Sequence, residues 1–175
     1  NAGTAATYTW GTASLDLPES YKIKNIVELG ENLLIGTWKG TTPEVPQARV
    51  ADIFQWNRTA GSFFLPIRQE SNGVHWQITI GNITYFMAGN EGDIHATNGS
   101  SVKFIKRIPK HITNLEGERI IISSPAGVMH HQGKLYFAIA SSQGVGEEIA
   151  DGVGVWSLDL ETGALIMANQ ISTGN

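Results

Sequence analysis

Short apolar stretches recur along this chain, and polar clusters rich in Gly, Asn or Asp separate them. Short apolar stretches bounded by such turn residues are typical of β-strands. Three segments, at 26–40, 78–92 and 129–144, follow the order strand, turn, strand. Their turns carry Gly30, Gly81 and Gly133, a residue type that accepts the positive φ of short hairpin turns. The pattern therefore predicts three antiparallel β-hairpins.

A second hairpin follows each of the first three. These second hairpins are predicted at 51–67, 92–108 and 153–168, with Asn57, Asn98 and Asp159 at aligned positions where the turns begin. A shorter copy is present near the N-terminus, at 6–18. The repeating unit is therefore four short antiparallel strands, and it returns about every 50 residues.

A four-stranded unit repeated in this way is typical of a β-propeller blade. We expect an all-β fold in which residues 1–175 are part of one β-propeller domain of four-stranded antiparallel blades. About three and a half blades are expected, with a half blade at 6–18 and whole blades at 21–70, 72–109 and 118–172. Such a partial ring needs further blades, from the same longer chain, of which this would be a fragment, or from a second chain. A β-sandwich is the alternative.

Composition agrees with a β fold and narrows the function. The 175 residues include 20 Gly and 6 Pro, and Ile outnumbers Leu. The net charge is −4 and no block of Lys or Arg is present, which disfavours nucleic-acid binding. No apolar run approaches the ~20 residues of a membrane span. Without Cys there is no disulfide framework and no thiolate chemistry.

The connections expected at one end of the blades are the long ones, at 41–50, 109–118 and 145–152. Long loops on a rigid scaffold often bind ligands, although insertions are also simply tolerated there. Two Trp residues lie near the strand ends that border these loops, where they could stack on sugar rings or be buried between blades. The candidate ligand-face residues are Trp38, Glu44, Arg49, Trp76, His111, Glu147, Glu148 and Asp151.

No pattern in the sequence indicates catalysis, a cofactor or a metal. A nucleophile elbow and a phosphate-binding Gly-rich loop are both missing. His130 and His131 are adjacent, so on a strand we expect one to point inward and the other outward, which prevents shared chelation. Glu28 is the only carboxylate within the three innermost strands. The chain is therefore expected not to be an enzyme, although paired carboxylates for glycoside hydrolysis remain open.

The chain resembles the propeller-like domains of tailed-bacteriophage tail and virion proteins. The segments that carry the resemblance are NLLIGTWKG (32–40), DIFQWNRT (52–59), GNEGDIHATNG (89–99) and GVWSLD (154–159). These motifs describe strands and turns, and no catalytic residue carries over. The resemblance implies a virion component, otherwise an extracellular or surface protein, whose partners are other virion domains, domains of the same chain or a host-surface glycan.

Three functions follow from these observations. The first is a non-catalytic structural and interaction module of a larger virion or surface protein. The second is a carbohydrate-binding propeller that uses the long-loop face. The third is a propeller glycoside hydrolase, which would need two facing carboxylates ~5–9 Å apart.

Overall fold

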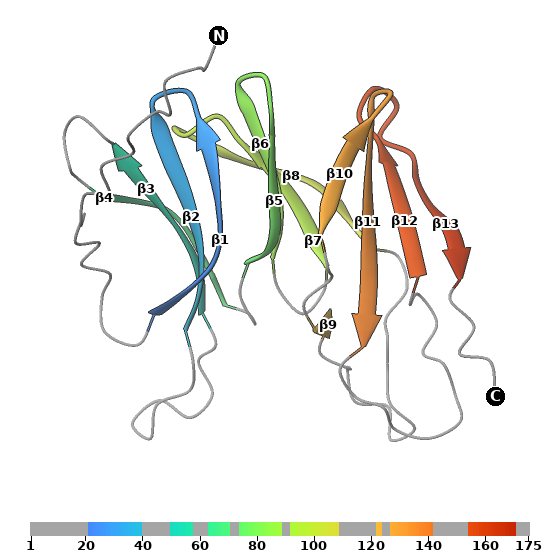
Figure 1. Ribbon diagram of the computed structural model, residues 1–175, viewed down its shortest axis with the longest axis horizontal. Coiled ribbons are helices and arrows are strands. Elements are labelled where there is room, and N and C mark those ends of the chain that lie inside the picture. The colour runs from blue at the N-terminus through green and yellow to red at the C-terminus, as the bar shows by residue number, and fades with distance from the viewer. Residues whose placement is uncertain are drawn as a thin grey trace, which may run out of the picture.

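The computed structural model describes residues 21–39, 50–57, 63–70, 74–88, 92–108, 122–123, 127–141 and 154–170. Within these ranges all regular structure is β and no residue is helical (Figure 1). The predicted all-β, antiparallel fold is therefore confirmed. None of the described residues forms a helix that is long and apolar enough to cross a membrane. The half blade predicted at 6–18 lies outside the described residues.

The strands form three antiparallel sheets, and within each four-stranded path every strand pairs with the next one along the chain. The first sheet contains β1 (Tyr21–Leu29), β2 (Asn32–Lys39), β3 (Val50–Asn57) and β4 (Phe63–Glu70). The second sheet contains β5 (Val74–Ile80), β6 (Ile83–Ala88), β7 (Asp93–Thr97) and β8 (Val102–Arg107). The third sheet contains β10 (Val128–His131), β11 (Lys134–Ser141), β12 (Gly154–Asp159) and β13 (Leu165–Gln170), and the two-residue β9 (Ile122–Ser123) pairs with the end of β11.

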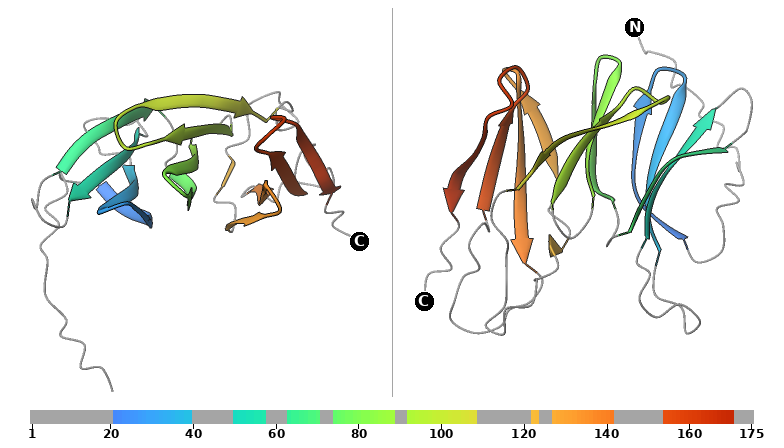
Figure 2. Two further views of the ribbon diagram at one scale, coloured as in Figure 1. Left: turned by 90° about the horizontal axis from the view of Figure 1, so that it is seen from above. Right: turned by 180° about the vertical axis from the view of Figure 1, so that it is seen from behind.

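The three sheets stand side by side in an arc (Figure 2). The first strand of each sheet, β1, β5 or β10, lies along the inner side of the arc, and the last strand, β4, β8 or β13, lies along the outer side. Strand β5 contacts both β1 and β10, so the second sheet packs on a neighbour through each of its faces.

The tight turns between strands follow the predicted chemistry, with one difference. Gly30 and Gly81 have φ of +60° and +59° and come first in their two-residue turns, as a type II′ hairpin turn requires. In the third hairpin Gln132 comes first with φ of +48°, and Gly133 follows with φ of +74°. Two successive positive φ angles are the signature of a type I′ turn. Gly133 is thus one position later than the alignment of the three glycines predicted.

A β-bulge places Val74 and Trp76 on opposite faces of the second sheet. The register of β5 against β6 shifts between Val74 and Trp76. Without a bulge, residues two apart would point to the same face. Instead Val74 joins the apolar cluster on the first sheet, and Trp76 joins the cluster on the third.

Apolar side chains fill the spaces between the sheets. Leu34 and Ile53 pack with Phe86 between the first and second sheets. A larger cluster lies between the second and third sheets, where alternation along β11 and β12 directs every second side chain inward. Its buried members are Trp76, Met87, Ile94, Ile108, Leu135, Phe137, Ile139, Trp156 and Leu158.

Candidate functional site: a groove between two hairpin turns

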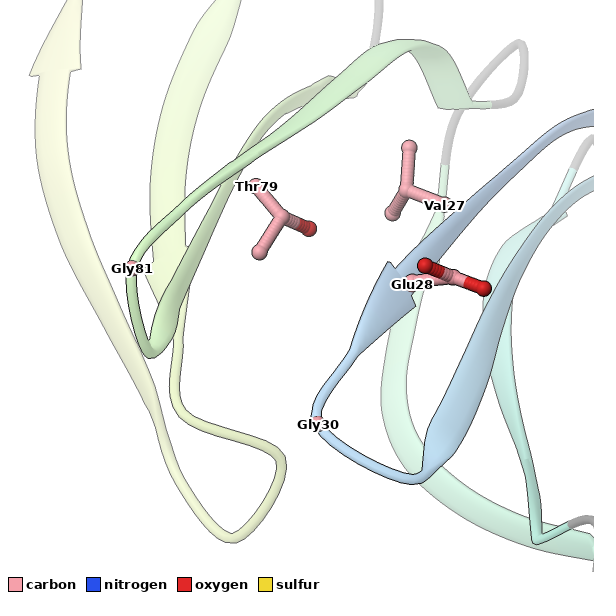
Figure 3. Close-up of a pocket in the computed structure, with 5 residues that line it drawn as sticks. All are labelled: Val27, Glu28, Gly30, Thr79 and Gly81. Carbon is pink, nitrogen blue, oxygen red and sulfur yellow. The ribbon is translucent and has the colours of Figure 1, made fainter.

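A groove of about 480 Å³ lies between the β1–β2 and β5–β6 hairpins. Val27 of β1 and Thr79 of β5 lie on opposite sides of it, and Gly30 and Gly81 mark the two turns (Figure 3). Glu28 completes the lining. The groove is therefore at the end of the sheets that carries the tight turns, whereas the sequence predicted the ligand face at the end with the long connections.

Few polar groups of the groove are available for chemistry. The hydroxyl of Thr79 shares a hydrogen bond of 2.8 Å with the hydroxyl of Thr84, a buried residue. Glu28 is exposed and is the only ionisable residue among the five that line the groove. Hydrolysis of a glycoside by the usual mechanism needs a pair of carboxyl groups. The lining residues supply a single carboxyl group, that of Glu28.

The second sheet meets the first just beyond this groove through a partly buried amide pair. Gln77 donates from Nε2 to Asn25 Oδ1 at 2.7 Å, and Asn25 donates from Nδ2 to the carbonyl of Val74 at 3.1 Å. Gln77 Nε2 also lies 3.3 Å from the carbonyl of Leu34. These bonds join residues about 50 positions apart, so they fix how the two sheets are aligned.

Gly36 is what allows this close approach. A Cβ at this position would overlap Asn25 Oδ1 and would lie only 2.9 Å from Gln77 Nε2 and 3.0 Å from a methyl group of Val74. A glycine inside a strand often marks such a contact between elements. Gly36 was not among the candidate residues predicted from the sequence, although a glycine within the apolar strand β2 is the available signal.

His95 lies on the same side of the second sheet. Its ring stacks on Phe86 with centroids 5.2 Å apart and meets the edge of Phe104 at 5.6 Å. Burial lowers the pKa of His95, because the charged imidazolium loses solvation. The neighbouring Asp93 acts in the opposite direction, but Asp93 is itself held by Arg107 through two hydrogen bonds of 2.6 and 2.9 Å. Folding therefore shifts His95 toward the neutral imidazole.

Asn98 and Asp159, which were predicted to begin turns, accept hydrogen bonds from the backbone of the turn that follows. Asn98 Oδ1 accepts hydrogen bonds from the backbone N–H groups of Ser100 and Ser101, both at 3.0 Å. Asp159 Oδ1 accepts from the corresponding groups of Glu161 and Thr162. The hydrogen bonds from Thr162 are the largest cause of the lowered pKa of Asp159. Both are the local side-chain bonds that favour Asn and Asp at turns.

The predicted ligand-face residues are not brought together by the described part of the structure. Trp76 is only 3% exposed, and its ring lies 5.2 Å from that of Phe137, so it packs in the core and presents no stacking surface. Trp38 belongs to β2, where its backbone pairs with Lys22. The other six candidates lie outside the described residues: Glu44, Arg49, His111, Glu147, Glu148 and Asp151.

The adjacent histidines differ from the prediction. His130 and His131 are both exposed, so the expectation that one of them points inward is wrong. β10 is an inner strand, and it ends at His131, beside an exposed turn where both rings reach solvent. Among the residues that the structure describes, no group of three or more His, Cys, Asp or Glu side chains could hold a metal ion.

Comparison with known protein families finds no family model that matches the chain. Comparison with curated proteins likewise finds no match.

Proposed function

We propose that this chain is a non-catalytic structural and interaction module whose three sheets are consecutive blades of a β-propeller. One observation carries the proposal: each sheet packs face to face on the next, with the first strands β1, β5 and β10 together on the inner side of the arc (Figure 2). Blades of a propeller are arranged in this way around their axis. Two sheets of a sandwich would enclose a single shared core, whereas here the second sheet buries both faces.

The chemistry of the described residues supports a structural role. The interior between the sheets is filled with apolar side chains and hydrogen-bonded amides, which serve packing and alignment. The groove adds one carboxylate and one hydroxyl that is already hydrogen-bonded. A site of this composition fits a contact surface better than a catalytic centre.

The resemblance to bacteriophage tail and virion domains extends the proposal to a location and to partners. In this view the module lies on a virion, or otherwise on an extracellular surface. It contacts other virion domains or other domains of its own chain, and the ring is completed by further blades. Binding of a host-surface glycan and hydrolysis of a glycoside are the two alternatives that an experiment must separate from it.

A glycan array combined with a panel of chromogenic glycosides tests this proposal. We expect neither glycan binding nor hydrolysis above the buffer rate. Binding that is lost in Trp38→Ala, or on replacement of residues 41–50, would establish the carbohydrate-binding alternative. Turnover that is lost in Glu28→Gln, with the fold intact by circular dichroism, would establish the hydrolase and overturn the proposal.

A further inference from the structure

The face of the first sheet that points away from the second sheet is buried along β2 and β3. We call this surface the far face of the first sheet. Leu34 and Ile53 point toward the second sheet, so the residues that follow them, Ile35 and Phe54, point the other way. Thr37 shares the side of Ile35. These three side chains on the far face are 0%, 2% and 0% exposed, so a layer of other residues covers them.

The described strands do not supply this layer. Among the described strands outside the first sheet, only β5 contacts that sheet extensively, and it lies on the side of the second sheet. Figure 2 shows the first sheet at one end of the arc, with the other two sheets to one side of it. We therefore look for the covering residues in parts of the chain outside the described ranges.

The repeat indicates what kind of layer covers the far face. Phe54, His95 and Trp156 hold the same place in the aligned segments at 52–54, 93–95 and 154–156. His95 stacks on Phe86 on the side of the first sheet, and Trp156 packs in the cluster shared with the second sheet. They are 6% and 3% exposed, each on the face toward the preceding sheet. Phe54 is equally buried, so we expect a layer like a preceding sheet over it.

The covering layer does not extend over the inner strand β1. Ile23 and Ile26 are also on the far face, where they pair with Thr37 and Ile35, but they are 45% and 49% exposed. Val74 and Gln77 hold the same places in β5, directly before the bulge and three residues later. These two residues contact the first sheet and are only 1% and 7% exposed. The layer over the first sheet thus covers β2 and β3 and leaves β1 open.

The sequence of residues 6–18 has the pattern of two short strands with one apolar side. Tyr8 and Trp10 alternate with polar residues, and so do Leu15 and Leu17. Side chains two residues apart along a strand point to the same side of a sheet. The pattern therefore suits a layer that packs on a sheet with one side and faces solvent with the other.

The repeat also predicts which strands of a blade these are. Residues 6–18 correspond to the last two strands of the four-stranded unit, with Leu17 and Pro18 at the places of Leu65 and Pro66 in β4. In the described sheets the last strands are the outer ones (Figure 2). The segment also ends just before β1, as β4 ends just before β5. Two outer strands without inner ones would cover a neighbouring sheet everywhere except along its inner strand.

We propose that residues 6–18 pack on the far face of the first sheet as the two outer strands of a further blade. Their apolar side chains cover Ile35 and Phe54. Ile23 and Ile26 stay exposed because no inner strands accompany the outer ones. This placement rests on the proposed propeller packing, and it continues the stacking seen between the described sheets.

Photo-cross-linking in the otherwise unchanged chain tests this contact. The probe is p-benzoylphenylalanine in place of Trp10, and mass spectrometry locates the cross-links. We expect them within the same chain, on β2 and β3. The same probe in place of Thr9 is the matched control, because the neighbouring side chain is expected to point to solvent. Cross-links from position 10 that fall outside the first sheet would overturn the proposal.

Thiol accessibility tests the cover itself, since the chain has no Cys of its own. Ile35→Cys and Ile94→Cys are matched, because both Ile residues are 0% exposed and only Ile35 lies on the far face. We expect both thiols to react slowly with Ellman's reagent. Adding Trp10→Glu and Leu17→Glu should speed the reaction of the thiol at position 35 by about tenfold or more and leave the thiol at position 94 unchanged.

Two results of the thiol experiment would contradict the proposal. One is an unchanged rate at position 35 in the Trp10→Glu, Leu17→Glu background. The other is protection that is lost only on replacement of residues 41–50. If the doubly substituted chain does not fold, so that both thiols react fast, the cross-linking result decides. Neither experiment reports on glycan binding or hydrolysis, so failure here and failure of the proposed function are distinguishable.

Discussion

The two interfaces of the second sheet are built in different ways. Toward the third sheet it buries large apolar side chains, including Trp76 against Phe137. Toward the first sheet the apolar cluster is smaller, and the Asn25–Gln77 amide pair lies beside Gly36. Apolar burial is non-directional, whereas hydrogen bonds require one geometry. The comparison indicates that the interface with the third sheet contributes more to stability, and that the interface with the first sheet fixes the alignment of the sheets.

Removal of an aromatic ring from the apolar interface should have the largest effect. Phe137→Ala leaves a cavity against Trp76, and we expect it to lower the free energy of unfolding by about 3–5 kcal/mol. Urea denaturation measures the change. Tyr136→Ala is the control, because Tyr136 is the next residue along β11 and points to the opposite face of the sheet. Equal losses for the two variants would contradict the importance given to this interface.

Filling the close approach at Gly36 should cost less. Gly36→Ala places a methyl group against Asn25 and Gln77, and we expect a loss of about 1–3 kcal/mol from overpacking. In an Asn25→Ala background the closest atom is gone, so the same substitution should cost clearly less. Additive losses in this double-mutant cycle would show that the contact with Asn25 is not the cause.

Removal of the hydrogen bond between the Gln77 and Asn25 side-chain amides should have a smaller effect. Gln77→Leu loses the bond to Asn25, but it also removes Oε1, a buried atom with no hydrogen-bond partner among the described residues. The two contributions oppose each other, so we expect a loss of about 1 kcal/mol. If this variant destabilised the protein as much as Phe137→Ala, the amide pair rather than the apolar cluster would dominate stability.

The smallest expected effect is a pH dependence of the free energy of unfolding, which arises from His95 at the interface with the first sheet. Because the pKa of His95 is lowered in the folded state, the unfolded chain binds a proton more readily. The free energy of unfolding therefore has its full value at pH above 6.5, the ordinary pKa of His. It falls as the pH drops from there through the lowered pKa of the folded state. His95→Phe should flatten urea-unfolding stability over this window, and His131→Gln, at an exposed site, should not. If the free energy of unfolding of His95→Phe changed with pH as steeply as that of the wild type, His95 would be excluded as the origin of the pH dependence.

The hairpins and their turns could be predicted from the sequence because they depend on local chemistry. Apolar stretches between turn residues located the paired strands, and positive φ at Gly30 and Gly81 follows from the short turns. The bulge between Val74 and Trp76 could not be predicted, because one extra residue in a strand leaves no periodic signal.

Contacts between repeats could not be predicted from the sequence. The groove combines Val27 with Thr79, and the amide pair joins Asn25 to Gln77, in each case across 52 positions. No local pattern links such residues. The sequence did single out Glu28 as the carboxylate of an inner strand, but it placed the candidate ligand face at the opposite end of the sheets.

Hydrogen exchange measured by mass spectrometry tests most directly whether the second and third sheets form one packed unit. We expect Phe137→Ala to speed amide exchange in β6 and β7 as well as in β11 and β12, because the lost ring supports both sheets. We expect a smaller change in β1 and β2. Faster exchange confined to the third sheet, with β6 and β7 unchanged, would show that the two sheets do not form one packed unit.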